Sequence, residues 1–246
     1  MTYETFTASY KGSDFNYGVL RQSGYTNLKT VVLLGMDMDT TLTATTLNDV
    51  GTRLVAQGWA ALSLDIPCHG AWLFEGAQTG LNGWFDLCTS GENFVAQFVG
   101  RVNAMLEHAR GTGLSHKHKY AAVGVSRGGF LALHLAQADV IGTVVGISPV
   151  TKLTKLSEFA GHSGEEPCAL DPKVLRWYAG NLSISNRDTR VGTWDVCDLY
   201  KSVTEAQGVA SKKQWKLTVG AVDGDGHTQL TGAHEDAANW IAARIT

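Results

Sequence analysis

The residues with the clearest chemical potential form a serine between two glycines, Gly-Val-Ser-Arg-Gly at positions 124–128. An apolar run at 120–124 leads into this stretch, and a Leu- and Ala-rich pattern with helical spacing follows at 127–137, which predicts a strand-to-helix turn. Side chains at the two glycines would collide where the strand passes into the helix. A turn of this kind exposes the serine hydroxyl above the sheet and points the first amides of the helix at the same place. We therefore predict that Ser126 is a nucleophile.

Serine attacks a carbonyl only when a base takes its proton and a third group holds that base. A serine on such a turn is followed along the chain by the acid and then by the histidine. His227 fits this order, because it follows the predicted strand 214–221 in a loop whose glycines would let the imidazole turn inward above the sheet edge. The other downstream histidines outside the helix after Ser126 are His162, in an irregular stretch, and His234, in the last predicted helix, where we expect a surface residue. We predict that His227 is the base.

Asp188 is the candidate for the acid. It follows a short predicted strand at 182–185, and a carboxylate just beyond the carboxyl end of a strand lies at the rim where parallel sheets place functional groups. A carboxylate there could also cap a turn, and a catalytic Asp can do this as well as orient the histidine. The alternatives lie inside the next predicted helix or beside the histidine: Asp195, Asp198, Asp223 and Asp225.

Predicted strands and helices, which must position these groups, alternate along the chain of 246 residues. Apolar runs and two-residue alternation predict strands at 3–9, 14–21, 30–34, 60–64, 120–124, 141–147, 182–185 and 214–221. Helical spacing of apolar residues predicts helices at 40–57, 92–110, 127–137, 192–207 and 233–245, and residues 148–181 form a looser insert with one or two short helices. Strands that alternate with helices predict an α/β fold with a mostly parallel sheet.

Composition excludes several classes of function. The chain has 20 basic and 23 acidic residues, and the basic ones form no block. This argues against binding to nucleic acid and against binding to a membrane through a polybasic segment. No apolar run approaches membrane-spanning length, and the first residues lack the features of a signal peptide, so we expect a cytoplasmic protein. The four cysteines include no CxxC pair, so we expect buried thiols, no zinc or other metal, and no cofactor.

Several of these stretches together resemble an α/β-hydrolase: the serine turn with residues 129–133, the strand-end segment 188–191 and Gly-His-Thr at 226–228. Within that superfamily they are most similar to the small esterase and dienelactone-hydrolase branch related to prolyl oligopeptidases. Residues 64–70 are also similar to the Asp-x-Pro-Gly-His-Gly turn of the family, with Cys68 in place of the glycine.

The resemblance covers residues 25–246 and implies the fold. The expected architecture is an eight-stranded sheet in which strand 2 is antiparallel and the rest are parallel, with helices on both faces. We expect one domain over residues 1–246, in which 148–181 form a small partial cap.

The resemblance also implies where a carbonyl oxygen would be held. The family places His-Gly after the third strand, where the next residue donates one amide of the oxyanion hole, but here the matching residues 35–39 are Gly-Met-Asp-Met-Asp. Alignment gives that amide to Asp37, and Met36 or Met38 would donate instead if the loop were shifted by one residue. The backbone N–H of Arg127 is the expected second donor. Carboxylates beside the hole would repel anionic substrate groups and favour polar or hydroxylated ones.

Aromatic residues in the segments that would overhang the site could line a substrate cleft, or could equally serve core or cap packing: Trp72, Trp84, Trp177 and Trp194. The leading functional hypothesis is a serine carboxylic-ester hydrolase that acts on small-molecule, short-chain acyl esters, acylated sugars included. A peptidase of the prolyl-oligopeptidase type is disfavoured, because too few residues precede the first core strands to form its propeller. A non-catalytic binding protein of the hydrolase fold is disfavoured by the complete triad.

Overall fold

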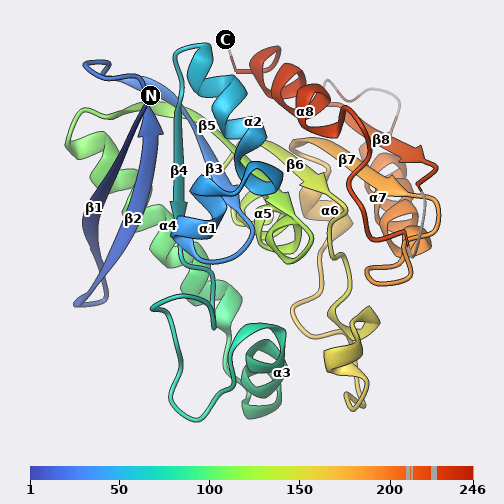
Figure 1. The fold of residues 1–246 in the computed structure, drawn as a ribbon. Coiled ribbons are helices and arrows are strands. Elements are labelled where there is room, and N and C mark those ends of the chain that lie inside the picture. The colour runs from blue at the N-terminus through green and yellow to red at the C-terminus, as the bar shows by residue number, and fades with distance from the viewer. Residues whose placement is uncertain (209–210, 212, 223–225, 246) are drawn as a thin grey trace.

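The computed structural model describes residues 1–208, 211, 213–222 and 226–245, with only the backbone at 117–119 (Figure 1). In this part of the chain eight strands form one sheet, in the order β1-β2-β4-β3-β5-β6-β7-β8. The strands are β1 (Thr2–Tyr10), β2 (Ser13–Arg21), β3 (Leu28–Leu34), β4 (Ala60–Leu64), β5 (Ser115–Val125), β6 (Thr143–Ile147), β7 (Ala179–Ser185) and β8 (Trp215–Gly220).

Strand direction follows the predicted pattern. β2 pairs antiparallel with both β1 and β4, and the neighbours from β4 to β8 are parallel. β4 is buried along its whole length, as its apolar sequence predicts for a strand covered on both faces. In β1, at the sheet edge, exposed residues alternate with half-buried or buried ones. The prediction of an eight-stranded, mostly parallel sheet is confirmed.

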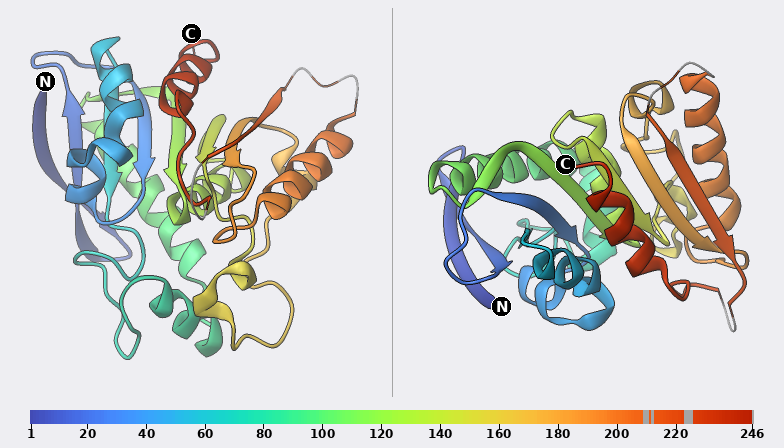
Figure 2. Two further views of the ribbon diagram at one scale, coloured as in Figure 1. Left: turned by 45° about the vertical axis from the view of Figure 1, so that its right-hand side comes forward. Right: turned by 90° about the horizontal axis from the view of Figure 1, so that it is seen from above.

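Helices cover both faces of the sheet (Figure 2). The helices are α1 (Met38–Thr43), α2 (Thr45–Ala56), α3 (Gly80–Ser90), α4 (Phe94–Gly111), α5 (Arg127–Gln137), α6 (Pro172–Leu175), α7 (Thr193–Gln207) and α8 (Ala233–Ala242), with 3₁₀ turns η1 (Leu153–Lys155) and η2 (Ser157–Phe159). No helix in the described ranges is both long and apolar enough to cross a membrane.

The core is divided by the sheet into two layers. On one face α1, α2 and α8 pack apolar side chains such as Leu54 and Ile241 against the strands, and on the other face lie α4, α5 and α7. Neighbouring residues of one strand point into different layers, as Val144 and Val145 of β6 do. This two-sided burial keeps the strand ends, which carry the candidate groups, in one rigid frame.

Two helices differ from the prediction. The predicted helix 40–57 is broken at Ala44, which has extended backbone angles and separates α1 from α2. The break lies in a threonine-rich stretch whose branched side chains disfavour helix, and the Asn48 side chain donates to the carbonyl of Leu42 at the end of α1. Helix α3 was not predicted, because glycine at 80 and 83 and polar residues interrupt its apolar spacing.

Candidate active site

Ser126 lies on a strained turn between β5 and α5. Its backbone angles are φ 52° and ψ −117°, outside the regions that non-glycine residues ordinarily adopt. Strand β6 holds the turn, since the Ser126 N–H donates to the Ile147 carbonyl at 2.9 Å and the Ser126 carbonyl accepts from the Val150 N–H at 3.0 Å. A Cβ on Gly124 would lie 2.0 Å from the Gly128 carbonyl oxygen. The two glycines are therefore required by close backbone approach.

Gly128→Ala is expected to destabilise the protein by more than about 3 kcal/mol, because the new Cβ would lie 2.0 Å from the carbonyl oxygen of Leu34 and only backbone movement can relieve the clash. Urea unfolding measures this as a lower midpoint. Gly111→Ala is the matched control: its Cβ would meet no described heavy atom within 4 Å, and alanine favours a helix, so a change within about 1 kcal/mol is expected. Equal effects in both variants would contradict the steric account.

The structure brings Ser126, His227 and Asp188 together in one chain of contacts. The Ser126 hydroxyl lies 3.2 Å from His227 Nε2, and His227 Nδ1 lies 2.9 Å from Asp188 Oδ2. The three residues follow β5, β8 and β7, which lie in the same half of the sheet. In this arrangement Nδ1 donates its proton to the carboxylate and Nε2 faces the hydroxyl as an acceptor.

Asp188 is held rigidly. Its side chain is 0% exposed, and Oδ1 accepts from the backbone N–H groups of Arg190 and Val191, each at 3.0 Å. Thr193 Oγ1 accepts from the Asp188 N–H at 3.0 Å and donates to the Ser185 carbonyl at 2.7 Å. Oδ1 of the carboxylate therefore caps the turn, while Oδ2 contacts His227. The buried hydrogen bonds fix the orientation of the carboxylate.

The histidine loop is anchored on both sides of His227. The Ser185 hydroxyl at the end of β7 donates to the Gly226 carbonyl, and the Ser148 hydroxyl after β6 donates to the Thr228 carbonyl at 3.5 Å. Gly226 has φ 85°, and a Cβ there would lie 2.2 Å from the Arg187 carbonyl oxygen. Sequence reasoning did not identify Ser148, Ser185 or Thr193, because a serine or threonine near a strand end carries no distinguishing pattern.

The other histidines and carboxylates considered lie elsewhere. His162 Nε2 contacts the Glu165 carbonyl, and Asp195 accepts from Lys152 at 2.7 Å. His234 is not the surface residue expected: its side chain is 13% exposed and bonds to Gln229. The alternative acids Asp223 and Asp225 lie outside the described residues.

Two of the four amides considered for an oxyanion hole are engaged by other residues. The Met36 N–H donates to Thr41 Oγ1 at 3.0 Å, and the Met38 N–H donates to Asp65 Oδ1 at 2.8 Å. The Arg127 N–H has no hydrogen-bond partner among the described residues, and the Asp37 N–H is hydrogen-bonded to the carboxylate of its own residue.

The Asp37 carboxylate accepts from more than one backbone N–H, that of Asp37 itself included. It caps α1 by accepting from the Thr40 N–H at 2.8 Å. Burial opposes ionisation of Asp37, but its hydrogen bonds from Thr40 hold the pKa below the usual value, so the group is anionic at neutral pH.

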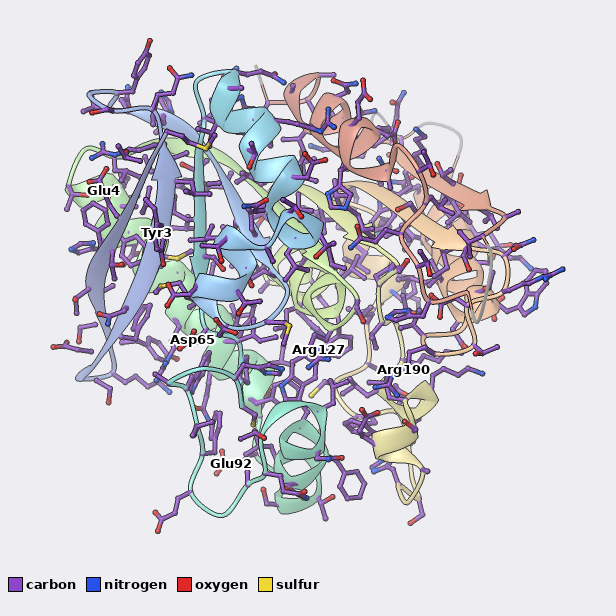
Figure 3. The ribbon with its side chains drawn as sticks, in the orientation of Figure 1. Tyr3, Glu4, Asp65, Glu92, Arg127 and Arg190 are labelled. Atoms are coloured by element: carbon purple, nitrogen blue, oxygen red, sulfur yellow. The ribbon has the colours of Figure 1, made fainter. Side chains whose placement is uncertain are left out.

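The Arg127 side chain contacts His69. Arg127 Nη1 donates to His69 Nε2 at 2.7 Å, and His69 Nδ1 lies 2.8 Å from the Pro67 carbonyl. Burial lowers the pKa of His69, and the neighbouring Arg127 lowers it further, so the ring is neutral and donates from Nδ1. Figure 3 shows Arg127 and Arg190 between the sheet and the region of α3 and η2. The Arg190 guanidinium pairs with Glu158 and Ser157, which ties this region to the strand-end loop.

Comparison with known proteins adds to this geometry. No family model matches the chain, and no curated protein matches it in sequence. Among solved structures, an esterase of Pyrococcus furiosus superposes with a TM-score of 0.70 at 14% identity, over 100% of this chain and 94% of that one. A dienelactone hydrolase from Anabaena variabilis gives 0.61 at 15% identity, over 100% and 99% of the two chains. A prolyl endopeptidase gives 0.69 at 16% identity, over 99% of this chain and 38% of the other.

The chain has the α/β-hydrolase fold. The similarity runs along the whole chain and agrees with the strand order and the antiparallel second strand. At these identities it concerns the fold, so the predicted resemblance to α/β-hydrolases is confirmed at that level.

The tryptophans occupy different places in this α/β-hydrolase fold. Trp84 does not line the site: it is 0% exposed, packs against Phe94 and Phe130, and donates Nε1 to the Pro67 carbonyl at 2.7 Å. Trp177 is exposed but precedes the amino end of β7, whereas Asp188 follows its carboxyl end, so about 20 Å of strand separates them. Trp84 therefore takes the core-packing alternative considered for it, and Trp177 lies at the opposite end of β7 from Asp188.

The other two tryptophans border hollows beside the candidate site. Trp72 is 5% exposed under the Arg101 guanidinium, which lies 3.9 Å from its ring centre, and both border a hollow of about 450 Å³ that includes Asp37. Trp194 is 77% exposed and borders a hollow of about 530 Å³ next to Asp188. Of the four tryptophans, these two remain candidates for substrate contact.

Proposed function

We propose that the protein is a serine carboxylic-ester hydrolase. The observation that carries the proposal is the contact chain from Ser126 through His227 to a buried, doubly anchored Asp188. A hydroxyl on a strained turn, an imidazole acceptor and a carboxylate in this order form the constellation that generates an alkoxide-like nucleophile at neutral pH. The esterase and dienelactone hydrolase of the same fold support this reaction class.

The residues divide the reaction between them. Ser126 Oγ attacks the ester carbonyl while His227 Nε2 takes the proton, and the carbonyl π electrons move onto the oxygen. The Arg127 N–H, which has no other partner among the described residues, and the Asp37 N–H stabilise this oxyanion. His227 then protonates the leaving alcohol, which leaves an acyl-serine. Water, deprotonated by the same imidazole, attacks the acyl group and releases the carboxylic acid and free Ser126.

A p-nitrophenyl acetate assay with stopped-flow detection tests the proposal. We expect turnover, with a burst of p-nitrophenol of about one equivalent wherever deacylation is the slower step. Mass spectrometry of the acid-quenched reaction should find the acetyl group on the peptide that contains Ser126. A binding protein of the same fold would show neither turnover nor an acyl adduct, and an adduct on another residue would refute the assignment.

Short acyl groups are expected to react best. The segment 148–181 contributes only the short η1, η2 and α6 between β6 and β7, which can form a partial roof but no deep enclosing cap. A long acyl chain would therefore remain in water instead of being buried, and would add little binding energy. Acetyl and butyryl p-nitrophenyl esters should give higher kcat/KM than decanoyl and palmitoyl esters, without activation at a lipid interface. A preference for the long-chain esters would contradict this.

The acidic groups beside the candidate oxyanion hole favour neutral, hydroxylated substrates. Asp37 and Asp39 follow β3, and Asp65 lies opposite them with Oδ1 on the Met38 N–H. A panel of acetylated and feruloylated sugars compared with succinylated analogues measures this selectivity. Acylated sugars are expected to be preferred, and faster hydrolysis of the anionic esters would refute the electrostatic argument.

A further inference from the structure

The hollow that includes Asp37 contains an arginine whose polar groups have no protein partner. Arg101 of α4 lines this hollow of about 450 Å³. Its guanidinium lies over two aromatic rings, 3.9 Å from the ring centre of Trp72 and 5.3 Å from that of Phe15. Within the described ranges, no hydrogen bond or ion pair links its N–H groups to another residue. The rings therefore hold the guanidinium without using its hydrogen-bonding capacity.

Arg101 is also half-buried, so part of its hydration has been lost. Burial lowers the pKa of Arg101, and the Asp65 carboxylate opposes this shift. Asp65 is already engaged, because it accepts from the Met38 N–H at 2.8 Å and from the Ala71 N–H at 2.7 Å. A charged group that loses water without gaining an acceptor is unfavourable, and oxygen atoms of a bound ligand would compensate for that loss.

The hollow lies beside the candidate oxyanion hole. It is lined by Asp37, the candidate first donor of that hole, and by Asp65. Asp65 follows β4 and Ser126 follows β5, and both strands are parallel to β3 between them, so the two residues lie at the same edge of the sheet. Figure 3 shows Asp65 and Arg127 beyond this edge. An ester held at Ser126 can therefore extend its alcohol portion toward the hollow.

The polar groups of the hollow are of both hydrogen-bonding kinds. Arg101 offers N–H donors, whereas Asp14 and Asp39 offer carboxylate oxygens, and Asp39 already accepts from the Tyr3 hydroxyl. A hydroxyl group both donates and accepts, so neighbouring hydroxyls of one ligand can use both kinds. An anionic group would face the carboxylates, and a cationic group would face the fixed guanidinium.

We propose that this hollow is a subsite for the sugar portion of an acylated sugar, to whose oxygen atoms Arg101 donates hydrogen bonds. The inference rests on the proposed esterase function. Asp14 and Asp39 accept from the sugar hydroxyls while the acyl carbonyl lies at Ser126. Because Trp72 already restricts the guanidinium, little side-chain freedom is lost on binding. Arg101 determines specificity in this arrangement and takes no part in bond breaking.

Two acetates of six-membered rings test the subsite, since a monoacetylated methyl xyloside carries hydroxyls and cyclohexyl acetate carries none. The native protein should hydrolyse the xyloside with the higher kcat/KM. Arg101→Met should lower the ratio of the two kcat/KM values by about 10–100-fold, because its unbranched side chain still covers Trp72 but donates no hydrogen bond. If Arg101→Met does not fold, Arg101→Lys, which keeps the charge but not the planar fork, should lower the ratio by a smaller factor.

Arg244→Met is the matched control. Arg244 also lies over a tryptophan ring, that of Trp240 in α8, but it does not line the hollow. Its removal should leave the ratio at the native value.

Binding without hydrolysis gives an independent measurement. Saturation-transfer NMR should detect methyl xyloside on the Ser126→Ala variant, and the signal should disappear when Arg101→Met is added. Absence of the signal from Ser126→Ala, or its persistence in the double variant, would contradict the subsite.

Three kinetic results would overturn the proposal. One is a native protein that hydrolyses cyclohexyl acetate at least as efficiently as the xyloside ester. Another is an unchanged ratio in folded Arg101→Met. The third is a higher kcat/KM for acetylcholine than for the xyloside ester, which would show that the carboxylates select a cation. Any of these results beside turnover of p-nitrophenyl acetate refutes the subsite alone, whereas absence of that turnover refutes the proposed esterase function.

Discussion

Ser126→Ala is expected to lower kcat for ester hydrolysis by about 10⁴–10⁶-fold and to leave the fold intact. The hydroxyl 3.2 Å from His227 is the proposed nucleophile, and without it the imidazole has no group to deprotonate for attack on the ester. Alanine keeps the same Cβ, so the backbone with φ 52° is no more strained than with serine. The close backbone contacts at Gly124 and Gly128 are unchanged in this variant. Its circular dichroism spectrum and Tm should therefore match those of the native protein.

A matched control shows whether a loss of activity comes from the missing Ser126 hydroxyl or from the preparation of a variant protein. Ser9→Ala removes an exposed hydroxyl from the edge strand β1 and should retain full activity. Both variants are assayed with p-nitrophenyl acetate, and the acyl-enzyme is sought by mass spectrometry. If purified Ser126→Ala kept near-native turnover or a burst, the nucleophile would be another group.

Asp188→Asn is expected to lose about 10²–10⁴-fold in kcat while KM changes little. Asparagine has nearly the same shape, and its oxygen can still accept from Arg190 and Val191, but its NH₂ group then faces His227 Nδ1. The imidazole must accept from that group, so its proton moves to Nε2, which faces Ser126 and can no longer act as the base. The loss therefore appears in the chemical step and not in binding.

The comparison variants for this prediction lie on neighbouring elements. Asp195→Asn removes a partly exposed carboxylate that pairs with Lys152 and should leave kcat within about twofold. Asp223→Asn and Asp225→Asn should likewise stay active. If one of them lost activity while Asp188→Asn kept it, the acid would belong to the histidine loop.

Local sequence patterns determined most of the architecture. The apolar run at 60–64 and the Leu- and Ala-rich pattern at 127–137 correspond to β4 and α5 with the predicted bounds. Ser126, Asp188 and His227 could be selected from the sequence because the spacing of glycines and the ends of strands can be recognised there. The structure brings these three side chains into contact. The spacing of apolar residues shows whether a segment is a helix or a strand and which of its faces is buried. It can do so because short-range sterics fix how many residues each turn or pleat of the backbone contains.

Tertiary structure decided what depends on partners distant in the chain. The engagement of the Met38 N–H by Asp65 and the hydrogen bond of Ser185 to the Gly226 carbonyl each require segments distant in the chain to approach through the assembled sheet. Burial of Trp84 likewise follows from its neighbours Phe94 and Phe130 and not from its own surroundings in the sequence. A residue type states which bonds a side chain can make, whereas the three-dimensional packing selects which of them form, because each bond forms only where folding brings its partner within about 3 Å.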